Sequence, residues 1–338
     1  MTKYQLKPAI ILGSGFHRHV LGEGASSQAA CLYDWHQLVT HTAQRLQIAT
    51  PSTHQPPVLR WESMIIDAAH DGYRDRRGHW RIALRPGQTP NPLGLGEHPV
   101  PAAHRIERDA QAAVAQLLHE ASLDYPRSRR SEIPTDPRWG CVISLNFDHA
   151  WQPGLQRRDL ASTQWNPPLT HPPRARPQRR MTVREERRLR ASIAPKPRSA
   201  GRSRPRLWFP NGSVLQPEMI RMGLRDYGAA PEAIRLAFNG LKTWERRQGL
   251  GKLPPALAFE RTASALSKAS EATSTADLSA FFDGDSVDKQ DRFPLTWVAE
   301  FLYRPLVFAG IGLSDQESGL WWLLAQRQRN LARVERPT

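Results

Sequence analysis

The stretch that decides the fold is Ala9-Ile10-Ile11-Leu12-Gly13-Ser14-Gly15. Its four consecutive apolar residues are typical of a strand covered on both faces, as in a parallel sheet. The Gly-x-Gly turn that follows lets the backbone approach a phosphate group and can aim N–H groups at it. A tight turn after a core strand uses the same residues, because the full six-residue dinucleotide fingerprint is absent. We therefore expect an α/β fold, with either a phosphate turn or a plain turn at this point.

The composition excludes several classes of protein. The chain has 338 residues, a net charge of +15 and 29 prolines. Its two cysteines, Cys31 and Cys141, are too few for a disulfide scaffold or a four-cysteine zinc site, so we expect a reduced cytoplasmic protein without a metal. The N-terminus leads directly into the first strand, and no run of about 18 apolar residues occurs, so we predict neither a signal peptide nor a membrane span.

Most of the positive charge lies in residues 153–206. This segment has 14 arginines and one lysine against three acidic residues, a net charge of +12, and prolines interrupt it repeatedly. We interpret it as a basic Pro/Arg-rich insertion that is flexible when isolated. It either binds nucleic acid or an acidic partner, or it is a solvated surface loop. Its one tryptophan, Trp165, argues against base stacking.

The rest of the chain is expected to form one domain, 1–338, in which helices alternate with strands. Helices are predicted at 34–48 with Asp34 as its cap, at 61–69, at 106–118, in a segment with Pro231 in its first turn, at 293–303, and from a Ser314/Glu317 capping box onward. Residues 51–103 are predicted to form a smaller lobe outside the sheet, and residues 262–290 a linker or small helices.

Polar or glycine-rich motifs follow three further apolar strands. The stretch at 139–148 is predicted to be a buried strand that ends in Asn146-Phe147-Asp148, and the strand-like piece at 207–213 contains Asn211-Gly212. The strand at 305–309 leads to a second glycine turn, 310–315. Ligands gather at the carboxyl ends of parallel strands. Because Asn146 and Asp148 are two residues apart, strand alternation would direct both toward one cleft. A helix cap for the first motif and a plain strand–helix joint for the last remain alternatives.

In this order the motifs resemble the bacterial sirtuin-like (SIR2-like) domains of antiphage defence. The motifs concerned are Gly13-Ser14-Gly15, Asn146-Phe147-Asp148, Asn211-Gly212 with Asp226-Tyr227, and Gly310-Ile311-Gly312-Leu313-Ser314-Asp315. The resemblance spans residues 7–325 without the basic insertion, and its specificity comes from the order of these short motifs. It implies a doubly wound, Rossmann-like parallel sheet that binds NAD, and a homo-oligomer or a complex with a separate ATPase subunit.

The resemblance also implies a role for each motif. The first turn would lie against the pyrophosphate, Asn146 would face the nicotinamide ribose, and Asp148 would face the nicotinamide amide. The residues that would contact NAD are Gly13, Ser14, Gly15, Asn146, Asp148, Gly212, Gly310, Gly312, Ser314 and Asp315, the last four at the adenosine end. Members of this branch cleave the N-glycosidic bond of NAD, which requires an oxocarbenium-like centre and a water nucleophile. Asn146, Asp148 and Asn211 are therefore the candidate catalytic residues.

One departure from the family pattern leaves the activity open. Asn211 stands where the family has histidine, and an asparagine binds a ribose hydroxyl but takes no proton near neutral pH. His17, His19 or His149 could replace it, although His17 and His19 also fit solvated loop residues. Two functions follow: an NAD glycohydrolase effector, or a degenerate module that binds NAD, an ADP-ribose-type nucleotide or nucleic acid as a sensor or assembly subunit.

Overall fold

The computed structural model is an α/β structure built on a parallel sheet. It describes residues 6–22, 25–71, 73–74, 80–81, 101–125, 136, 138–148, 150, 192–193, 205–271, 293–312 and 317–334. The parallel strands are β1 (Ala9–Leu12), β4 (Cys141–Ser144), β6 (Arg206–Trp208) and β7 (Leu306–Ala309), in the spatial order β6-β4-β1-β7. The short β5 (Ser192–Ile193) pairs antiparallel with β6, and β2 (Tyr73–Arg74) with β3 (Trp80–Arg81) forms a separate hairpin.

The strand order reverses beside β1, the first strand in the chain. Ile11 of β1 lies opposite Ile143 of β4 on one side and Phe308 of β7 on the other. Every residue of β1 and β4 is buried, as their apolar runs predict, whereas the edge strand β7 is partly exposed. This arrangement is compatible with a Rossmann-like fold, in which ligands bind where the strand order reverses.

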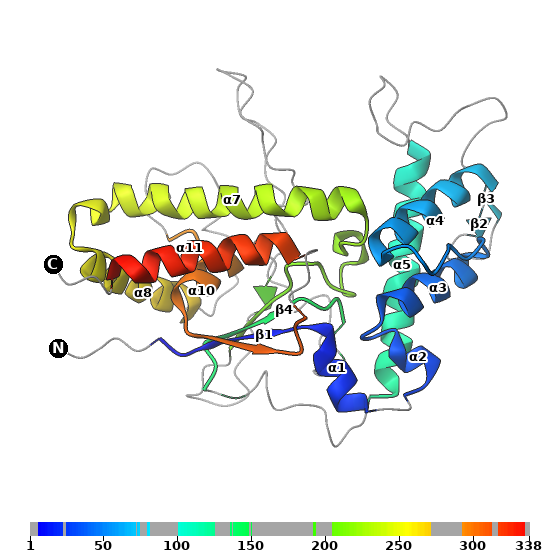
Figure 1. Cartoon of the computed structure of the whole chain (residues 1–338), viewed down its shortest axis with the longest axis horizontal. Coiled ribbons are helices and arrows are strands. Elements are labelled where there is room, and N and C mark those ends of the chain that lie inside the picture. The colour runs from blue at the N-terminus through cyan, green and yellow to red at the C-terminus, as the bar shows by residue number, and fades with distance from the viewer. Residues whose placement is uncertain are drawn as a thin grey trace.

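The helices form two groups, one at each side of the molecule (Figure 1). The first group lies toward the carboxyl ends of the strands and comprises α1 (Ser14–Leu21), α2 (Ser27–Ala30), α3 (Trp35–Leu46), α4 (Pro57–Asp71) and α5 (Pro101–Leu123). The second comprises α7 (Leu224–Arg247), α8 (Pro255–Glu271), α10 (Trp297–Tyr303) and α11 (Ser318–Val334), with the 3-10 turn η6 (Leu250–Lys252). Another 3-10 turn, η5 (Pro217–Met219), packs against α5 of the first group. Strand β1 runs from the second group toward α1 in Figure 1.

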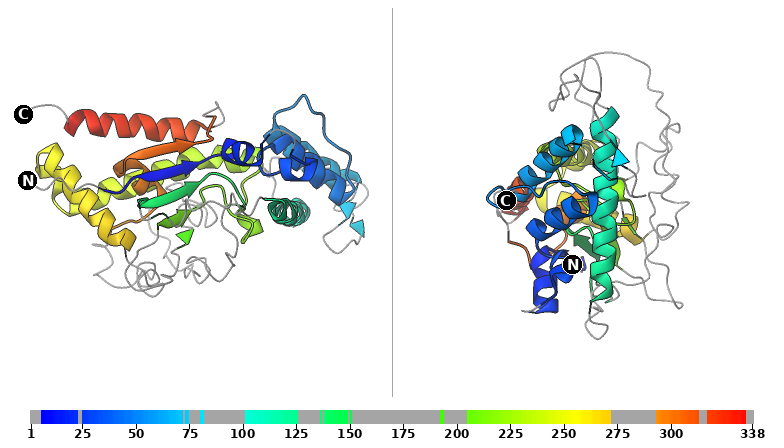
Figure 2. Two further views of the ribbon diagram at one scale, coloured as in Figure 1. Left: turned by 90° about the horizontal axis from the view of Figure 1, so that it is seen from below. Right: turned by 90° about the vertical axis from the view of Figure 1, so that its right-hand side faces the viewer.

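The second group of helices covers one face of the sheet. Ile11, Ile143 and Trp208 from that face share a core with Ile234 of α7 and Phe301 of α10, and we call this cluster the sheet core. Figure 2 shows α11 on one side of the strands. The residues of the opposite face form a separate small cluster: Ile10, Leu12, Val142, Leu207 and Phe209.

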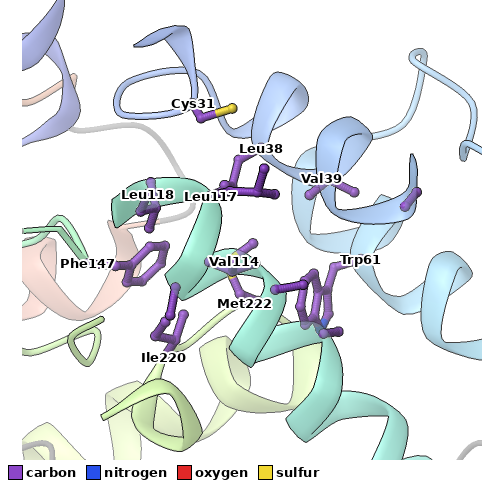
Figure 3. Close-up of a cluster of buried hydrophobic side chains, with 14 of the residues drawn as sticks. Cys31, Leu38, Val39, Trp61, Val114, Leu117, Leu118, Phe147, Ile220 and Met222 are labelled. Carbon is purple, nitrogen blue, oxygen red and sulfur yellow. The ribbon is translucent and has the colours of Figure 1, made fainter. Parts of the chain in front are cut away.

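Helices α2 to α5 form a lobe with its own core, which we call the lobe core (Figure 3). Leu38 of α3, Trp61 of α4 and Val114 of α5 lie in it, together with Phe147 and Ile220. Phe147 follows β4 and Ile220 follows β6, so the lobe is packed against the carboxyl edge of the sheet. Burying these side chains contributes about 1.5–3 kcal/mol for each large apolar residue.

The apolar patterns predicted most of these elements. The expected strands and the helices at 34–48, 61–69 and 106–118 are confirmed, with longer bounds for the last two. The cap of α3 is confirmed as well, because Asp34 Oδ1 accepts hydrogen bonds from His36 N at 2.8 Å and Gln37 N at 3.3 Å. A buried helix also occupies most of 293–303, although it begins only at Trp297.

One helix boundary was predicted wrongly. Pro231 lies inside α7, which begins at Leu224 instead. The helix starts earlier because Glu62 Oε1 of α4 accepts a hydrogen bond from Leu224 N at 2.7 Å, a tertiary cap that satisfies a terminal N–H group. Residues 262–290 were predicted to form a linker or small helices, and residues 262–271 are the end of helix α8, with Thr262 and Leu266 buried.

Several predicted segments lie outside the described residues. They include residues 75–79 and 82–100 of the predicted small lobe, nearly all of the basic segment 153–206, and residues 272–290. The insertions therefore stay predictions. Among the described helices none is long and apolar enough to cross a membrane. In the same described ranges, no group of three or more His, Cys, Asp or Glu side chains could hold a metal ion.

Candidate functional site

A cavity of about 410 Å³ lies where the carboxyl ends of the parallel strands meet the helical lobe. The turn after each of the four strands contributes to its lining: Gly13 and Ser14 after β1, Leu145 and Asn146 after β4, Asn211 after β6, and Gly310, Ile311 and Gly312 after β7. The first group of helices supplies the facing wall: Arg18, Tyr33, Asp34, Trp35, His36 and Pro57. The volume lies in the range of small-molecule sites, and the position is that of ligands in open parallel sheets.

The two glycine turns lock together at the floor of this site. Gly13 N donates to Ala309 O, and Gly15 N donates to Gly310 O, both at 2.9 Å. A Cβ atom on Gly13 would lie 2.4 Å from Gly310 O. The N–H groups of Gly13 and Gly15 are thus engaged between the turns, although they were expected to face a phosphate. Gly13, Ser14, Gly310 and Gly312 line the cavity, whereas Gly15 is not among its lining residues.

Asn146 is the buried polar group in this cavity that most clearly calls for a ligand. The residue is 6% exposed, and its Nδ2 has no hydrogen-bond partner among the described residues. The backbone beside it is held firmly, because Leu145 N donates to Leu12 O and Leu145 O accepts from Asn211 Nδ2, both at 2.9 Å. An unsatisfied buried amide costs about 1–3 kcal/mol, so a ligand acceptor at this position would remove that cost.

Asn211 joins the ends of β4 and β6 and also faces the cavity. Its Nδ2 donates to Leu145 O, and its Oδ1 accepts from Arg221 Nη1 at 3.4 Å. Both ends of the amide are therefore occupied within the protein. The next residue, Gly212, has φ of +90°, and a Cβ there would also come 2.0 Å from Met219 O. Gly212 thus shapes the turn, and it is not among the cavity-lining residues.

Asp148 is not among the residues that line the cavity, although the sequence predicted that it would face the same cleft as Asn146. Strand β4 ends at Ser144, so strand alternation does not extend through the bend that carries both side chains. Asp148 Oδ2 lies 3.1 Å from His17 Nε2, and both side chains are almost completely buried. Ala150 N also donates to Asp148 Oδ1 at 2.9 Å.

The histidines considered as substitute bases are placed elsewhere. His17 is fully buried on α1, so it is neither a solvated loop residue nor part of the cavity lining. Its ring meets that of Tyr125 edge-on, with centroids 5.6 Å apart. Burial, and then the charge of Asp148, raises the pKa of Tyr125. His19 is exposed and is not among the lining residues either, and His149 lies outside the described residues.

An aromatic wall of the cavity was missed by the sequence interpretation. The ring of Trp35 lies 5.1 Å from that of Phe147 and 5.8 Å from that of Tyr227. Arg18 Cζ lies 5.3 Å from the centroid of the Tyr33 ring. The sequence predicted Trp35 only as part of the helix at 34–48, and Tyr227 only as part of the Asp-Tyr motif. Its neighbour Asp226 is buried and does not appear in the lining.

His36 is held at the cavity by the buried Arg60. The Nη1 atom of Arg60 lies 3.1 Å from both Nδ1 and the carbonyl oxygen of His36, while Nη2 donates to Thr40 Oγ1 and Pro51 O. Because a guanidinium only donates hydrogen bonds, Nδ1 must accept here, which leaves the ring proton on Nε2. Burial lowers the pKa of Arg60, and the charge of Asp34 opposes that effect.

Glu317 is the second carboxylate among the described lining residues, besides Asp34. It lies directly before α11, where the sequence had assigned it to a capping box. Burial raises the pKa of Glu317, and Arg221 opposes the shift. The expected cap, Ser314, and its neighbour Asp315 lie outside the described residues, so their predicted contacts with adenosine stay predictions.

Comparisons of the chain with family models, with curated proteins and with solved structures give no match. The site is therefore interpreted from its own geometry and from the order of the sequence motifs.

Proposed function

We propose that the protein is a sirtuin-like NAD glycohydrolase of bacterial antiphage defence, with a doubly wound, Rossmann-like core. The observation that carries the proposal is Asn146 Nδ2, which is buried without a hydrogen-bond partner among the described residues, in a cavity at the ends of four parallel strands. The strand motifs bring Gly13, Asn146 and Gly310 to that one cavity. The fold and the sequence resemblance therefore point to the same site.

The cavity offers groups that suit the two ends of a dinucleotide. The Asn146 amide can donate to a ribose hydroxyl oxygen, and the rings of Trp35 and Tyr227 offer apolar surface to a planar base. Breaking the bond between nicotinamide and ribose creates positive charge at the ribose. Oriented polar groups in a site shielded from water stabilise such charge better than water does. Asn146 is the residue expected to act directly at the ribose.

A second function is favoured by the geometry of Asn211. Its amide is engaged at both ends, and asparagine accepts no proton near neutral pH. A degenerate module would bind NAD or an ADP-ribose-type nucleotide without cleaving it, as a sensor or assembly subunit. The basic segment 153–206 could give such a subunit a nucleic-acid partner. In that case deletion of the segment abolishes DNA or RNA binding, and the binding weakens steeply with added salt.

Calorimetric titration with NAD, followed by product analysis, tests these alternatives. The wild type is expected to bind NAD and release nicotinamide. Asn146→Ala should weaken binding about 5- to 150-fold, which corresponds to the 1–3 kcal/mol of one buried hydrogen-bonding group. Asn239→Ala is the matched control, because it makes the same chemical change at an exposed position of α7.

The outcomes separate the two functions. NAD binding without nicotinamide release, with release gained in Asn211→His, supports the degenerate module. Absence of NAD and ADP-ribose binding contradicts both functions, as does an Asn146→Ala variant that binds as tightly as the wild type.

A further inference from the structure

We propose that Glu317 is the general base of this cavity and takes over the proton transfer that Asn211 cannot perform. The inference rests on the proposed NAD glycohydrolase function and names a catalytic residue for it. No sequence motif assigns this role to Glu317.

The position of Glu317 supports this role. It lines the main cavity together with Asn146 and Asn211. It also lines a smaller adjoining cavity of about 30 Å³, which Asn211 and Arg221 share. Glu317 therefore stands on the sheet side of the site, beside the position where the histidine of the family pattern is replaced.

The other candidate bases in the described lining are committed elsewhere. Asp34 caps α3 through two backbone N–H groups, and His36 accepts a hydrogen bond from Arg60. Tyr33 lies under the guanidinium of Arg18. The same lining also contains Tyr227. A tyrosine phenol ordinarily keeps its proton near neutral pH, so it does not serve as a general base there. Glu317 is the remaining carboxylate of the described lining residues.

The electrostatic surroundings tune Glu317 for proton transfer. Burial raises the pKa of Glu317, and the positive charge of Arg221 partly offsets that increase. A carboxylate whose pKa has moved toward neutrality is a stronger base than an exposed one. Arg221 also donates to Asn211 Oδ1, so one arginine connects the proposed base to the turn after β6.

In the proposed step, a water oxygen forms a bond to C1′ of the nicotinamide ribose. The bond between C1′ and the ring nitrogen breaks, and its electron pair stays on nicotinamide, which leaves as a neutral molecule. Glu317 accepts one proton of the attacking water and later gives it to solvent. The products are nicotinamide, ADP-ribose and one proton, so charge and atoms balance.

The first test compares Glu317→Gln with the wild type. Glutamine keeps the shape but accepts no proton, so nicotinamide release should fall at least about 100-fold, the usual contribution of a general base. NAD affinity should stay within about threefold, since the loss concerns the proton-transfer step. Glu260→Gln, the same change at an exposed position of α8, is the matched control and should retain the activity of the wild type.

The second test is the pH profile of nicotinamide release. As pH falls through the raised pKa of Glu317, the carboxylate is protonated and activity is lost. Arg221 lowers this pKa, so Arg221→Met should move the acid limb to higher pH, while Arg221→Lys should leave it closer to the wild-type position. The other charged or titratable groups of the described lining, Arg18, Tyr33, Asp34, His36 and Tyr227, are unchanged in both variants.

A stability measurement separates catalysis from folding. The raised pKa means that protonation of Glu317 stabilises the fold, and that this stabilisation is lost as pH rises through the raised pKa. Glu317→Gln should therefore unfold at a temperature no lower than that of the wild type at pH 7, and the difference should shrink at acid pH. If Glu317→Gln is inactive but unfolds at this temperature, its loss of activity is not caused by unfolding.

The outcomes also distinguish this inference from the function on which it rests. If the wild type releases no nicotinamide, both are overturned. If the wild type is active and Glu317→Gln keeps its rate within threefold, or if the acid limb is the same in Arg221→Met and Arg221→Lys, only the role of Glu317 is overturned.

Discussion

Gly310 adopts a φ of +64° in the turn after β7, and a Cβ atom there would lie 1.9 Å from Phe16 N. On the facing turn, a Cβ atom on Gly13 or Gly15 would lie 2.4 or 2.9 Å, respectively, from Gly310 O. The approach of the two turns thus explains Gly13, Gly15 and Gly310 without a bound phosphate, whereas it does not explain Gly312. Asn146 is the more informative residue, because its buried amide has no such structural explanation in the described chain.

The interlocked turns predict a sharp difference between two neighbouring glycines. Gly310→Ala should lower the free energy of unfolding by about 1–3 kcal/mol, since alanine disfavours a positive φ and its methyl group collides with backbone. Gly312→Ala is the control, because a Cβ there has no atom within 4 Å. Urea unfolding measures both, and equal losses in the two variants would contradict the interlocked arrangement.

At the scale of elements, the sequence predicts those helices and strands whose position depends on neighbouring residues in the chain. The apolar runs of β1 and β4 and the Asp34 cap of α3 are local, and each was located correctly. The start of α7 was missed because its cap comes from Glu62, which is distant in the sequence. The bend after β4 was missed because the alternation of a strand was extended beyond its last residue, Ser144.

The difference between local patterns and contacts of distant residues also explains which site residues the sequence could predict. Gly13, Asn146, Asn211 and Gly310 follow apolar strands, and the topology of a parallel sheet brings strand ends together. The cavity wall at Tyr33–His36 lies at the start of α3, and the packing of distant parts of the chain brings this segment to the cavity. Glu317 was assigned to a local cap, since nothing in its sequence neighbours reports burial. Asp148 is outside the cavity lining and pairs with His17, a contact that no spacing rule predicts.

The link between α3 and α5 is predicted to depend on pH. Arg45 Nη1 and Nη2 donate to the two carboxylate oxygens of Glu120 at 3.0 and 2.7 Å, and this lowers the pKa of Glu120. The stabilisation is present above the ordinary pKa of glutamate and is lost as pH falls through the lowered pKa. Because the pair is about one-third exposed, Arg45→Met should cost about 0.2–1 kcal/mol at pH 7.

Urea unfolding at neutral and acid pH checks this prediction. The cost of Arg45→Met should disappear at acid pH and diminish in high salt. Arg105→Met removes an exposed arginine of α5 itself and should show little pH dependence. A cost that is the same at both pH values would show that Arg45 stabilises the helices by packing alone.

At the scale of the whole molecule, the cavity lies between two hydrophobic cores. Its sheet-side lining belongs to strand ends packed on the sheet core, and its opposite wall belongs to α3 and the lobe core. Phe147 reaches the lobe core from the turn that carries Asn146. A ligand in the cavity would therefore contact both parts of the molecule at once.

This position predicts that a bound dinucleotide stabilises both parts. NAD at 100 times its dissociation constant should add about 2.7 kcal/mol to the free energy of unfolding. Amide hydrogen exchange should slow at the start of α3 and in the turn at 310–312 together. At the same NAD concentration Asn146→Ala should reduce the stabilisation to about 0.3–1.8 kcal/mol, because its binding is expected to be about 5- to 150-fold weaker. Protection confined to one of these two segments would show that the ligand does not bridge the cavity.

The two cysteines offer a way to time the opening of each core. Cys31 belongs to the lobe core and Cys141 to the sheet core, and both thiols are free and buried. Burial raises the pKa of Cys31 to about 11 and also raises that of Cys141, so neither is a reactive thiolate at neutral pH. An alkylating reagent can thus modify each sulfur only after its surroundings have come apart. The alkylation rate of Cys31 therefore reports how often the lobe core opens, and that of Cys141 how often the sheet core opens.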